Sequence, residues 1–287
     1  MTPTASTPSG NSNDQTASAL EHTLATRFPD LAAPATPEVP DDARVTWTND
    51  ERASELGLTR ALTGPDRGLA FLTGTQPGAR TFALGYSGYQ FGHLSPILGD
   101  GRAHLVGEWT MADGSSSPRP ADPRRFDLHL KGSGRTPFSR PGPDGKAPLG
   151  AVWREVVIGE ALHALGVPTS RALAVIDTGE HVRRRGPEPE PAGILVRTAS
   201  SHLRVGTFQY AQMQGDETMR RDLVNYALER HYPHLSHAGV DTGTVAEAEN
   251  RGATEPPALT LLRVVAMRQA GLIAQWMGLG FVHGVLN

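Results

Sequence analysis

Apolar and polar residues alternate over short distances in the part of the chain between about residue 45 and residue 200. Short runs there either alternate apolar with polar residues or are wholly apolar, and Gly-rich turns separate them. Such runs, bounded by Gly, Pro, Asn or Asp, are typical of β-strands. The pattern predicts that folding begins near 45–47 and that strands follow at 80–84, 102–108, 126–131, 171–177 and 193–198.

Helical periodicity dominates three other stretches. Between Leu149 and Leu165, apolar side chains recur at steps of three and four residues, and the following Gly166-Val-Pro168 ends the pattern. The stretch 217–231 is amphipathic. The stretch 257–277 is apolar on most faces, which predicts a core helix of a second, helical unit.

The order of these elements predicts an α+β fold in three regions. Residues 1–44 are rich in Pro, Ser and Thr, which predicts a disordered or extended N-terminal segment. Residues 45–207 are predicted to form a β-rich lobe, and residues 208–287 the start of a helical lobe. Within the β-rich lobe, the polar stretch 111–125 is predicted to be a surface loop.

The composition limits the classes of partner. The formal net charge of −3 gives no electrostatic reason to expect nucleic acid, and the absence of Cys excludes disulfides and thiolate chemistry. The first twenty residues lack the basic and apolar regions of a secretory signal, so we expect a cytoplasmic protein. The uncharged stretch 269–287 contains Gly, Gln and Asn, and Arg263 and Arg268 precede it. We therefore expect a helix and a loop there rather than a membrane span.

Two features suit the binding of phosphate groups. Gly99 and Gly101 flank an Asp just before Arg102, and glycine-rich turns can present backbone N–H groups to an anion. Lys131 ends a predicted strand, and Glu155 lies 24 residues later in the first turns of the predicted helix. A kinase-like lobe orders its phosphate-contacting lysine by such an ion pair. An ordinary hairpin turn and two unrelated surface charges are the alternatives.

Two arginines extend this candidate site. Arg197 lies near the end of the last predicted strand, and Arg204 lies seven residues later. A planar guanidinium can donate two hydrogen bonds to phosphate oxygens, although each arginine alone also fits a structural role. A Walker ATPase is excluded, because no Ser or Thr follows Gly145-Lys146 and Arg140 occupies the position of the first Gly.

Several long motifs occur in an order that resembles the selenoprotein O / YdiU family of protein adenylyltransferases. The likeness runs from about Phe71 to Asn287. It is carried by residues 86–92 (Tyr-Ser-Gly-Tyr-Gln-Phe-Gly), 98–102 (Leu-Gly-Asp-Gly-Arg), 130–140 (Leu-Lys-Gly-Ser-Gly-Arg-Thr-Pro-Phe-Ser-Arg), 154–155, 160–169, 197–206 and 283–287 (His-Gly-Val-Leu-Asn). The resemblance implies a protein-kinase-like fold, with a complete β-rich N-lobe and an α-rich C-lobe that is only partly present.

The resemblance also implies a reaction, in which AMP is transferred from ATP to Ser, Thr or Tyr hydroxyls of proteins. ATP would bind in the reverse sense to a kinase, so that the α-phosphate faces the acceptor. The positions that match the family's nucleotide contacts are Gly99, Gly101, Arg102, Lys131, Asp144, Gly145, Arg197 and Arg204, with Glu155 as the partner of Lys131.

The last residues depart from the family pattern. After the motif at 283–287, family members continue with Thr-Asp-Asn, which supplies a catalytic base and a metal ligand, and later with an Asp-Tyr-Gly segment. The resemblance therefore implies Mg²⁺ or Mn²⁺ in complete members, no metal ligand and no catalytic base up to Asn287, and a chain that is inactive as written. It also leaves the helix 257–277 short of packing partners, so we expect exposed apolar surface and aggregation.

Three other interpretations stay open. A non-catalytic, pseudokinase-like regulator would bind ATP without a metal through Lys131, Arg197 and Arg204. A kinase-type phosphotransferase would transfer the γ-phosphate instead of AMP. A remnant of a folded lobe would do neither.

Overall fold

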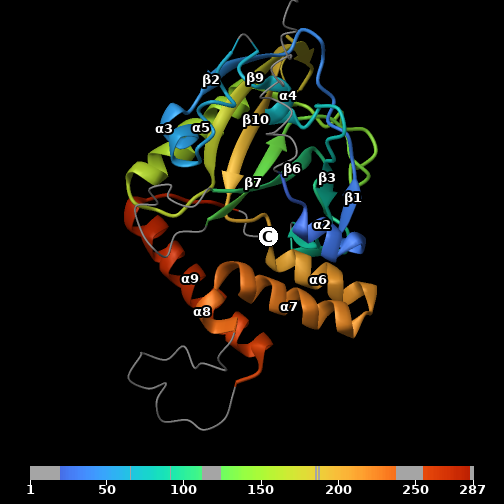
Figure 1. Cartoon of the computed structure of the whole chain (residues 1–287), viewed down its shortest axis with the longest axis vertical. Coiled ribbons are helices and arrows are strands. Elements are labelled where there is room, and N and C mark those ends of the chain that lie inside the picture. The colour runs from blue at the N-terminus through green and yellow to red at the C-terminus, as the bar shows by residue number, and fades with distance from the viewer. Residues whose placement is uncertain are drawn as a thin grey trace, which may run out of the picture.

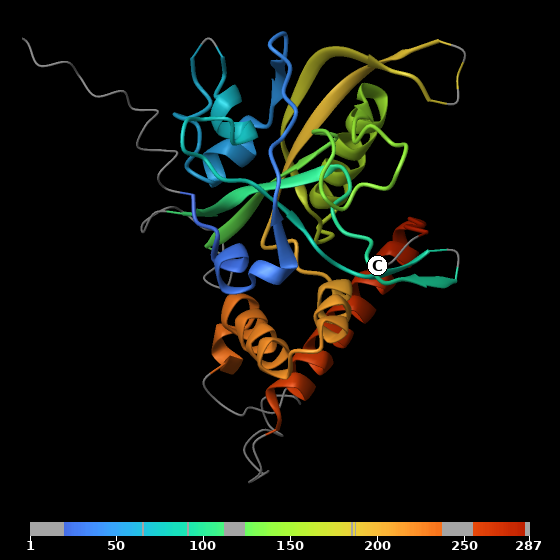
Figure 2. The same cartoon turned by 90° about the vertical axis from the view of Figure 1, so that its right-hand side faces the viewer.

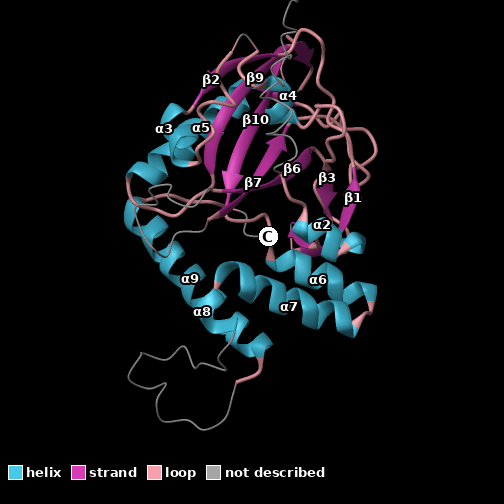
Figure 3. Cartoon of the chain, in the orientation of Figure 1, coloured by secondary structure: helices cyan, strands magenta, loops and turns pink. Residues whose placement is uncertain are grey.

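An antiparallel sheet of eight strands organises the chain in a computed structural model (Figure 1, Figure 3). The structure describes residues 20–64, 66–90, 92–111, 124–184, 186, 188–236 and 255–284. The strand order is β1-β3-β6-β7-β10-β9-β2, and the short β8 pairs with β10. The bounds are β1 Ala32–Pro34, β2 Arg44–Thr48, β3 Phe82–Leu84, β6 Ala103–Thr110, β7 Arg125–Lys131, β8 Ala147–Pro148, β9 Arg171–Val182 and β10 Glu190–Ala199. A separate hairpin consists of β4 Gly88–Gln90 and β5 His93–Ser95.

The register in the middle of the sheet gathers polar residues. On β7 and β10, Lys131 lies opposite Leu195, and His129 lies opposite Arg197. Directly opposed residues of antiparallel strands point to the same face, and so do alternate residues of one strand. Lys131, His129 and Arg197 therefore share one face of the sheet. Both edges of the sheet, in contrast, come from the N-terminal part of the chain, with β1 at one edge and β2 at the other.

Helices cover both faces of the sheet. Their bounds are α2 Thr23–Arg27, the 3-10 helix η1 Pro29–Leu31, α3 Asp50–Glu55, α4 Leu69–Thr73, α5 Leu149–Ala164, α6 Val205–Gln214, α7 Glu217–His231, α8 Pro233–Ser236 and α9 Pro257–Leu279. On one face, Leu56 beside α3 and Leu72 of α4 join Leu128, Leu130 and Ile194 of the sheet in an apolar cluster.

The opposite face carries two separate apolar clusters. In the first, Val152 and Val156 of α5 pack on Val175 and Leu195 of the sheet. In the second, α2, α6 and α7 enclose Phe28, Leu31, Leu105, Leu223 and Tyr226, among others. Figure 2 shows α6 and α7 below the sheet, at the end away from the long β9–β10 hairpin.

The α+β class is confirmed, and every predicted strand and helix has a counterpart in the structure. Among the helices that the structure adds, α3 and α4 have only six and five residues, too few for a periodic pattern to stand out. The predictions for residues 1–19 and for most of the polar loop, 112–123, lie outside the described residues.

The prediction of a disordered or extended N-terminal segment is wrong for residues 23–31, which form α2 and η1. Residues 32–34 are extended and form the ordered strand β1. Leu24, Phe28 and Leu31 are buried, with 5 %, 2 % and 0 % of their surface exposed. The neighbouring prolines indicated an extended chain, but these three apolar side chains enter the cluster of α6 and α7, and their burial stabilises the ordered segment.

The helix α9 is apolar but mostly exposed. Its buried residues are Thr260, Leu261 and Val264, of which the last two join an apolar cluster with residues of α7 and α8. Leu262 and Met277 remain 65 % and 76 % exposed. The predicted core helix therefore buries only one side, and the expected exposed apolar surface is present.

The same helix has the length and composition of a membrane-crossing helix, which sequence analysis did not expect. It begins at Pro257, well before the uncharged stretch, and 17 % of its most apolar window is buried. A single helix of this kind is weak evidence, because a helix of a soluble core can meet the same criteria.

Replacing Leu262 or Leu261 by Gln tests the placement of α9. Leu262→Gln should raise the monodisperse fraction in size-exclusion chromatography, because it removes exposed apolar surface without opening the core. Leu261→Gln, at a position 8 % exposed, should instead lower stability in urea unfolding by about 2–4 kcal/mol. Equal effects of the two substitutions would contradict the structure.

One buried and one half-buried histidine, His104 and His231, resist protonation. His104 contacts the Ser133 hydroxyl through Nδ1 at 2.7 Å, and burial lowers the pKa of His104 to about 4. His231 contacts Oγ of Ser201 through Nε2 at 2.8 Å. Burial, reinforced by the charge of Arg230, lowers the pKa of His231 to about 4 as well. Both imidazoles are therefore neutral in the folded chain at pH values where an exposed histidine is protonated.

Acidification should therefore weaken the fold. A histidine with a lowered folded-state pKa binds more protons when unfolded, so its full contribution to stability is present above pH 6.5 and is lost as the pH falls towards about 4. In urea unfolding, the free energy of unfolding should fall by about 1 kcal/mol per histidine between about pH 7.5 and about pH 5.5. The free energy of unfolding of a His104→Gln variant should fall less over this pH range than that of the unmodified chain. An identical fall would show that His104 does not contribute to the pH dependence of stability.

Candidate functional site

Asp127, His129 and Lys131 on β7 form the centre of the candidate site, and we call them the polar row. They alternate with apolar residues that point to the other face. Such alternation is typical of a half-buried strand, but both faces are covered, and Asp127 and His129 are 3 % and 0 % exposed. The segments that cover this face of the strand are distant in the sequence. The alternation along a single strand cannot predict their packing.

Glu155 joins Lys131 to Arg197. It lies near the start of α5, where Oε2 contacts Nζ of Lys131 and Oε1 accepts a hydrogen bond from Nη1 of Arg197 at 3.1 Å. Burial opposes ionisation of Glu155, but the charges of Arg197 and Lys131 outweigh it and lower its pKa. Burial lowers the pKa of Lys131, and the attraction of Glu155 works against this shift. One carboxylate thus holds two cations on one face of the sheet.

The Gly-Asp-Gly turn lies beside the end of β7. Gly132, which follows Lys131, donates its N–H to the carbonyl of Arg102 at 2.8 Å. Gly99 has a φ of 54°, and a Cβ there would lie 2.4 Å from Phe138. Glycine alone tolerates both the conformation and the close approach. The backbone therefore brings the predicted turn next to the predicted lysine.

The loop after β7 closes over this turn. Thr136 donates from Oγ1 to the carbonyl of Asp100 at 2.7 Å, and Ser139 donates from Oγ to the carbonyl of Gly101 at 2.6 Å. The carbonyls of the turn are thus held by hydroxyls of the loop.

The second predicted turn is only partly joined to the site. Gly145 packs on the loop that follows Lys131, where its carbonyl accepts the N–H of Gly134 at 3.2 Å. The carboxylate of Asp144, however, accepts two hydrogen bonds from Arg184 at 2.8 Å and 3.0 Å and is 42 % exposed. The structure therefore brings Gly145 close to Lys131 but directs Asp144 to another partner.

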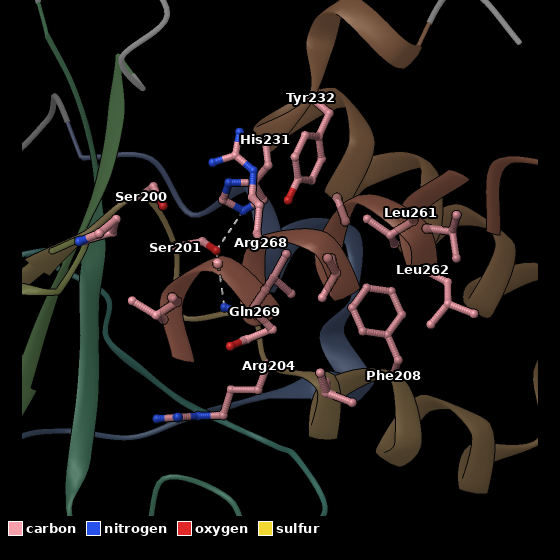
Figure 4. Close-up of a pocket in the computed structure, with 18 of the residues that line it drawn as sticks. Ser200, Ser201, Arg204, Phe208, His231, Tyr232, Leu261, Leu262, Arg268 and Gln269 are labelled. Carbon is pink, nitrogen blue, oxygen red and sulfur yellow. Dashed lines mark hydrogen bonds between the residues drawn. The ribbon is translucent and has the colours of Figure 1, made fainter. Parts of the chain in front are cut away.

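Arg204 occupies a different position from Arg197. It is the N-cap residue of α6, and its guanidinium carbon lies 4.6 Å from the centre of the Tyr86 ring. Figure 4 shows the guanidinium directed away from the apolar side chains of Phe208 and Leu261. Its charge acts on Asp100, which links Arg204 to the Gly-Asp-Gly turn.

A groove of about 750 Å³ lies between α6, α7 and α9 (Figure 4). Its lining is mainly apolar and includes Phe208, Tyr232, Leu261 and Leu262. The described residues that line it include Arg204 but no member of the polar row and not Glu155. The groove is therefore a separate feature from the cluster around Lys131.

Sequence analysis missed several polar residues behind Arg197. His129 donates from Nε2 to Oδ2 of Asp100 at 3.0 Å, and its Nδ1 accepts from Arg197 at 3.3 Å. The ring of His202 stacks on His129 with centroids 3.9 Å apart. Burial and the nearby His202 lower the pKa of His129 to about 3, so His129 is neutral. Burial opposes ionisation of Asp100, but the contact with His129 and the charge of Arg204 bring its pKa to about 2.

Asp127 anchors α7 to the sheet. Arg230 of α7 donates to Asp127 at 2.6 Å and to Glu108 of β6 at 2.5 Å, and none of the three side chains is more than 5 % exposed. The backbone N–H of His202 donates to the same Asp127 carboxylate at 2.7 Å. The one sequence signal for these contacts is the alternation that places Asp127 and His129 on the face of Lys131.

A metal centre does not fit the part of the chain that the structure describes. No three His, Cys, Asp or Glu side chains of these residues are placed to hold an ion together. The three buried carboxylates, Asp100, Glu108 and Asp127, are committed to histidine and arginine partners. We therefore assign no residue and no step to Mg²⁺ or Mn²⁺.

Comparison with known proteins gives one family along nearly the whole chain. The family model described as protein adenylyltransferase SelO matches residues 16–287. The protein nucleotidyltransferase YdiU of Chromobacterium violaceum is 46 % identical over 262 residues, which are 91 % of this chain and 49 % of that protein. The YdiU protein of Pseudarthrobacter chlorophenolicus is 44 % identical over 271 residues, or 94 % of this chain and 50 % of that protein.

The chain therefore spans about half the length of the curated relatives it matches. The agreement in sequence is spread over both regions of the fold, from the ordered N-terminal segment to α9. The resemblance found in the motifs is confirmed: this chain belongs to the SelO family of protein adenylyltransferases.

Proposed function

We propose that this chain is the ATP-binding part of a protein adenylyltransferase with a kinase-like fold, which transfers AMP to Ser, Thr or Tyr hydroxyls of proteins. Membership of the family supports nucleotidyl transfer. The observation that carries the site is that Lys131 and Arg197 share Glu155 beside the turn that ends at Arg102.

This arrangement suits the phosphates of ATP. Lys131 and Arg197 carry two positive charges against the single negative charge of Glu155, which leaves one positive charge for an anion. The ammonium acts as a point charge, and the guanidinium can donate two hydrogen bonds to phosphate oxygens. The glycines of the neighbouring turns allow backbone N–H groups to approach closely.

The proposal includes the orientation of ATP. We place the α-phosphate towards the acceptor, in the reverse sense to a kinase. The hydroxyl oxygen then forms a bond to the α-phosphorus while the bond to the bridging oxygen breaks, pyrophosphate leaves, and the hydroxyl proton passes to a base. A cytoplasmic location, where ATP is available, belongs to the same proposal.

Lysine labelling tests the site in the chain itself, which has only two lysines, Lys131 and Lys146. An acyl phosphate derivative of ATP acylates amines that lie next to bound phosphates. We expect acylation of Lys131, protected by excess ATP, and no protected acylation of Lys146, whose ammonium pairs with Glu180 at 2.5 Å. Peptide mass spectrometry reads both sites. Equal labelling that ATP does not reduce would contradict the proposed site.

The position of the label in ATP tests the reaction. A protein that contains this chain together with the remaining half of the family length is incubated with Mg²⁺ or Mn²⁺ and with ATP labelled at the α- or the γ-phosphate. We expect protein-bound label from the α-phosphate alone, and a loss of about 100-fold or more in Lys131→Met. Label from the γ-phosphate would favour a kinase-type phosphotransferase, and ATP binding without transfer of either label would favour a non-catalytic regulator.

A further inference from the structure

Arg197 is held on two sides of its guanidinium. Nη1 donates to Glu155 at 3.1 Å, and Nε and Nη2 both lie 3.3 Å from Nδ1 of His129. A guanidinium has five N–H groups, so one N–H on each of Nη1 and Nη2 remains for another acceptor. A phosphate could accept a hydrogen bond from these N–H groups. The Arg197 side chain is 15 % exposed, which restricts the directions they can take.

His129 can accept a hydrogen bond from Arg197 only as the neutral tautomer that carries its proton on Nε2. Its Nε2 lies 3.0 Å from Oδ2 of Asp100, a carboxylate that also receives the N–H of Leu84 at 3.2 Å. A carboxylate can only accept, so the proton of the neutral ring belongs on Nε2, and Nδ1 presents a lone pair. A protonated His129 would instead direct an N–H and a like charge at Arg197. Burial and the stacked ring of His202 favour the neutral form.

We propose that His129 is a positioning residue, which aims the guanidinium of Arg197 at the phosphates of the bound nucleotide through Nδ1 while Asp100 fixes the ring. This inference rests on the proposed function, because it assumes that Arg197 contacts ATP. His129 itself is fully buried and lies behind Arg197, so it acts through the arginine and not on the ligand.

Two substitutions that differ by one methylene group separate positioning from a general structural role. In His129→Asn, the amide oxygen occupies the region of Nδ1 and can accept from Arg197. In His129→Gln, the amide nitrogen reaches the region of Nε2 and can donate to Asp100, but the acceptor for Arg197 is lost. By calorimetry on the 287-residue chain, we expect His129→Asn to bind ATP within about threefold of the unmodified chain and His129→Gln to bind about tenfold more weakly.

A double-mutant cycle shows whether the effect passes through Arg197. In an Arg197→Ala background, His129→Gln should cause no further loss of ATP affinity, because there is no guanidinium left to aim. An additional tenfold loss would overturn the proposal, and so would unchanged affinity in His129→Gln alone. If the unmodified chain bound no ATP, or if Arg197→Ala left ATP binding unchanged, the proposed function or its site would fail instead.

The tautomer of His129 can be measured in the unmodified chain, which carries no destabilising substitution. Nitrogen-15 NMR of the unmodified chain, with the His129 signals assigned by their absence in His129→Asn, should show a protonated Nε2 and an unprotonated Nδ1. A proton on Nδ1, in either the neutral or the charged ring, would overturn the proposal even if His129→Gln failed to fold.

Discussion

Asp127 and His129, two of the three members of the polar row of β7, are buried, and the neighbouring elements supply their partners. An unpaired carboxylate in a protein interior costs several kcal/mol, so each member of the row needs a partner of suitable charge. The partners come from α7, from the turn before β6, from β10 and from α5: Arg230, Asp100, Arg197 and Glu155. The hydrogen bonds and ion pairs of the polar row also fix the positions of these elements. The same contacts therefore determine both how the helices pack and where the charged groups of the site lie.

The solvent exposure of the polar row increases along the strand from Asp127 to Lys131. At its inner end, Asp127 and His129 are closed off by the second apolar cluster and by α7. At its outer end, the side chains of Lys131 and Glu155 are 29 % and 30 % exposed, so water reaches them and a ligand can replace that water. The buried end of the row therefore holds its side chains in place, and the exposed end is accessible to a ligand. The two parts are connected by Arg197, which contacts both His129 and Glu155.

Local signals were sufficient for the elements and for Lys131 with Glu155, since Lys131 ends one strongly patterned segment and Glu155 lies in the second turn of the helix that follows. They were not sufficient for the interior of the site. Alternation on β7 shows that Asp127 shares a face with Lys131 but not that α7 covers this face. Arg230, the partner of Asp127, lies 103 residues away in the sequence, and no local pattern joins the two. The N-terminal segment was misjudged for the same reason, because its apolar residues pack on helices near the other end of the chain.

The two edges of the sheet have a consequence for how the molecule is made. β1 and β2 are separated only by residues 35–43, yet β2 pairs with β9, which begins at Arg171. A ribosome adds about 5–20 residues per second, so β2 waits on the order of 10 s for its partner to be synthesised. During this interval its backbone groups are open to any extended chain nearby. One edge of the finished sheet is thus completed late by one of the first strands to be made.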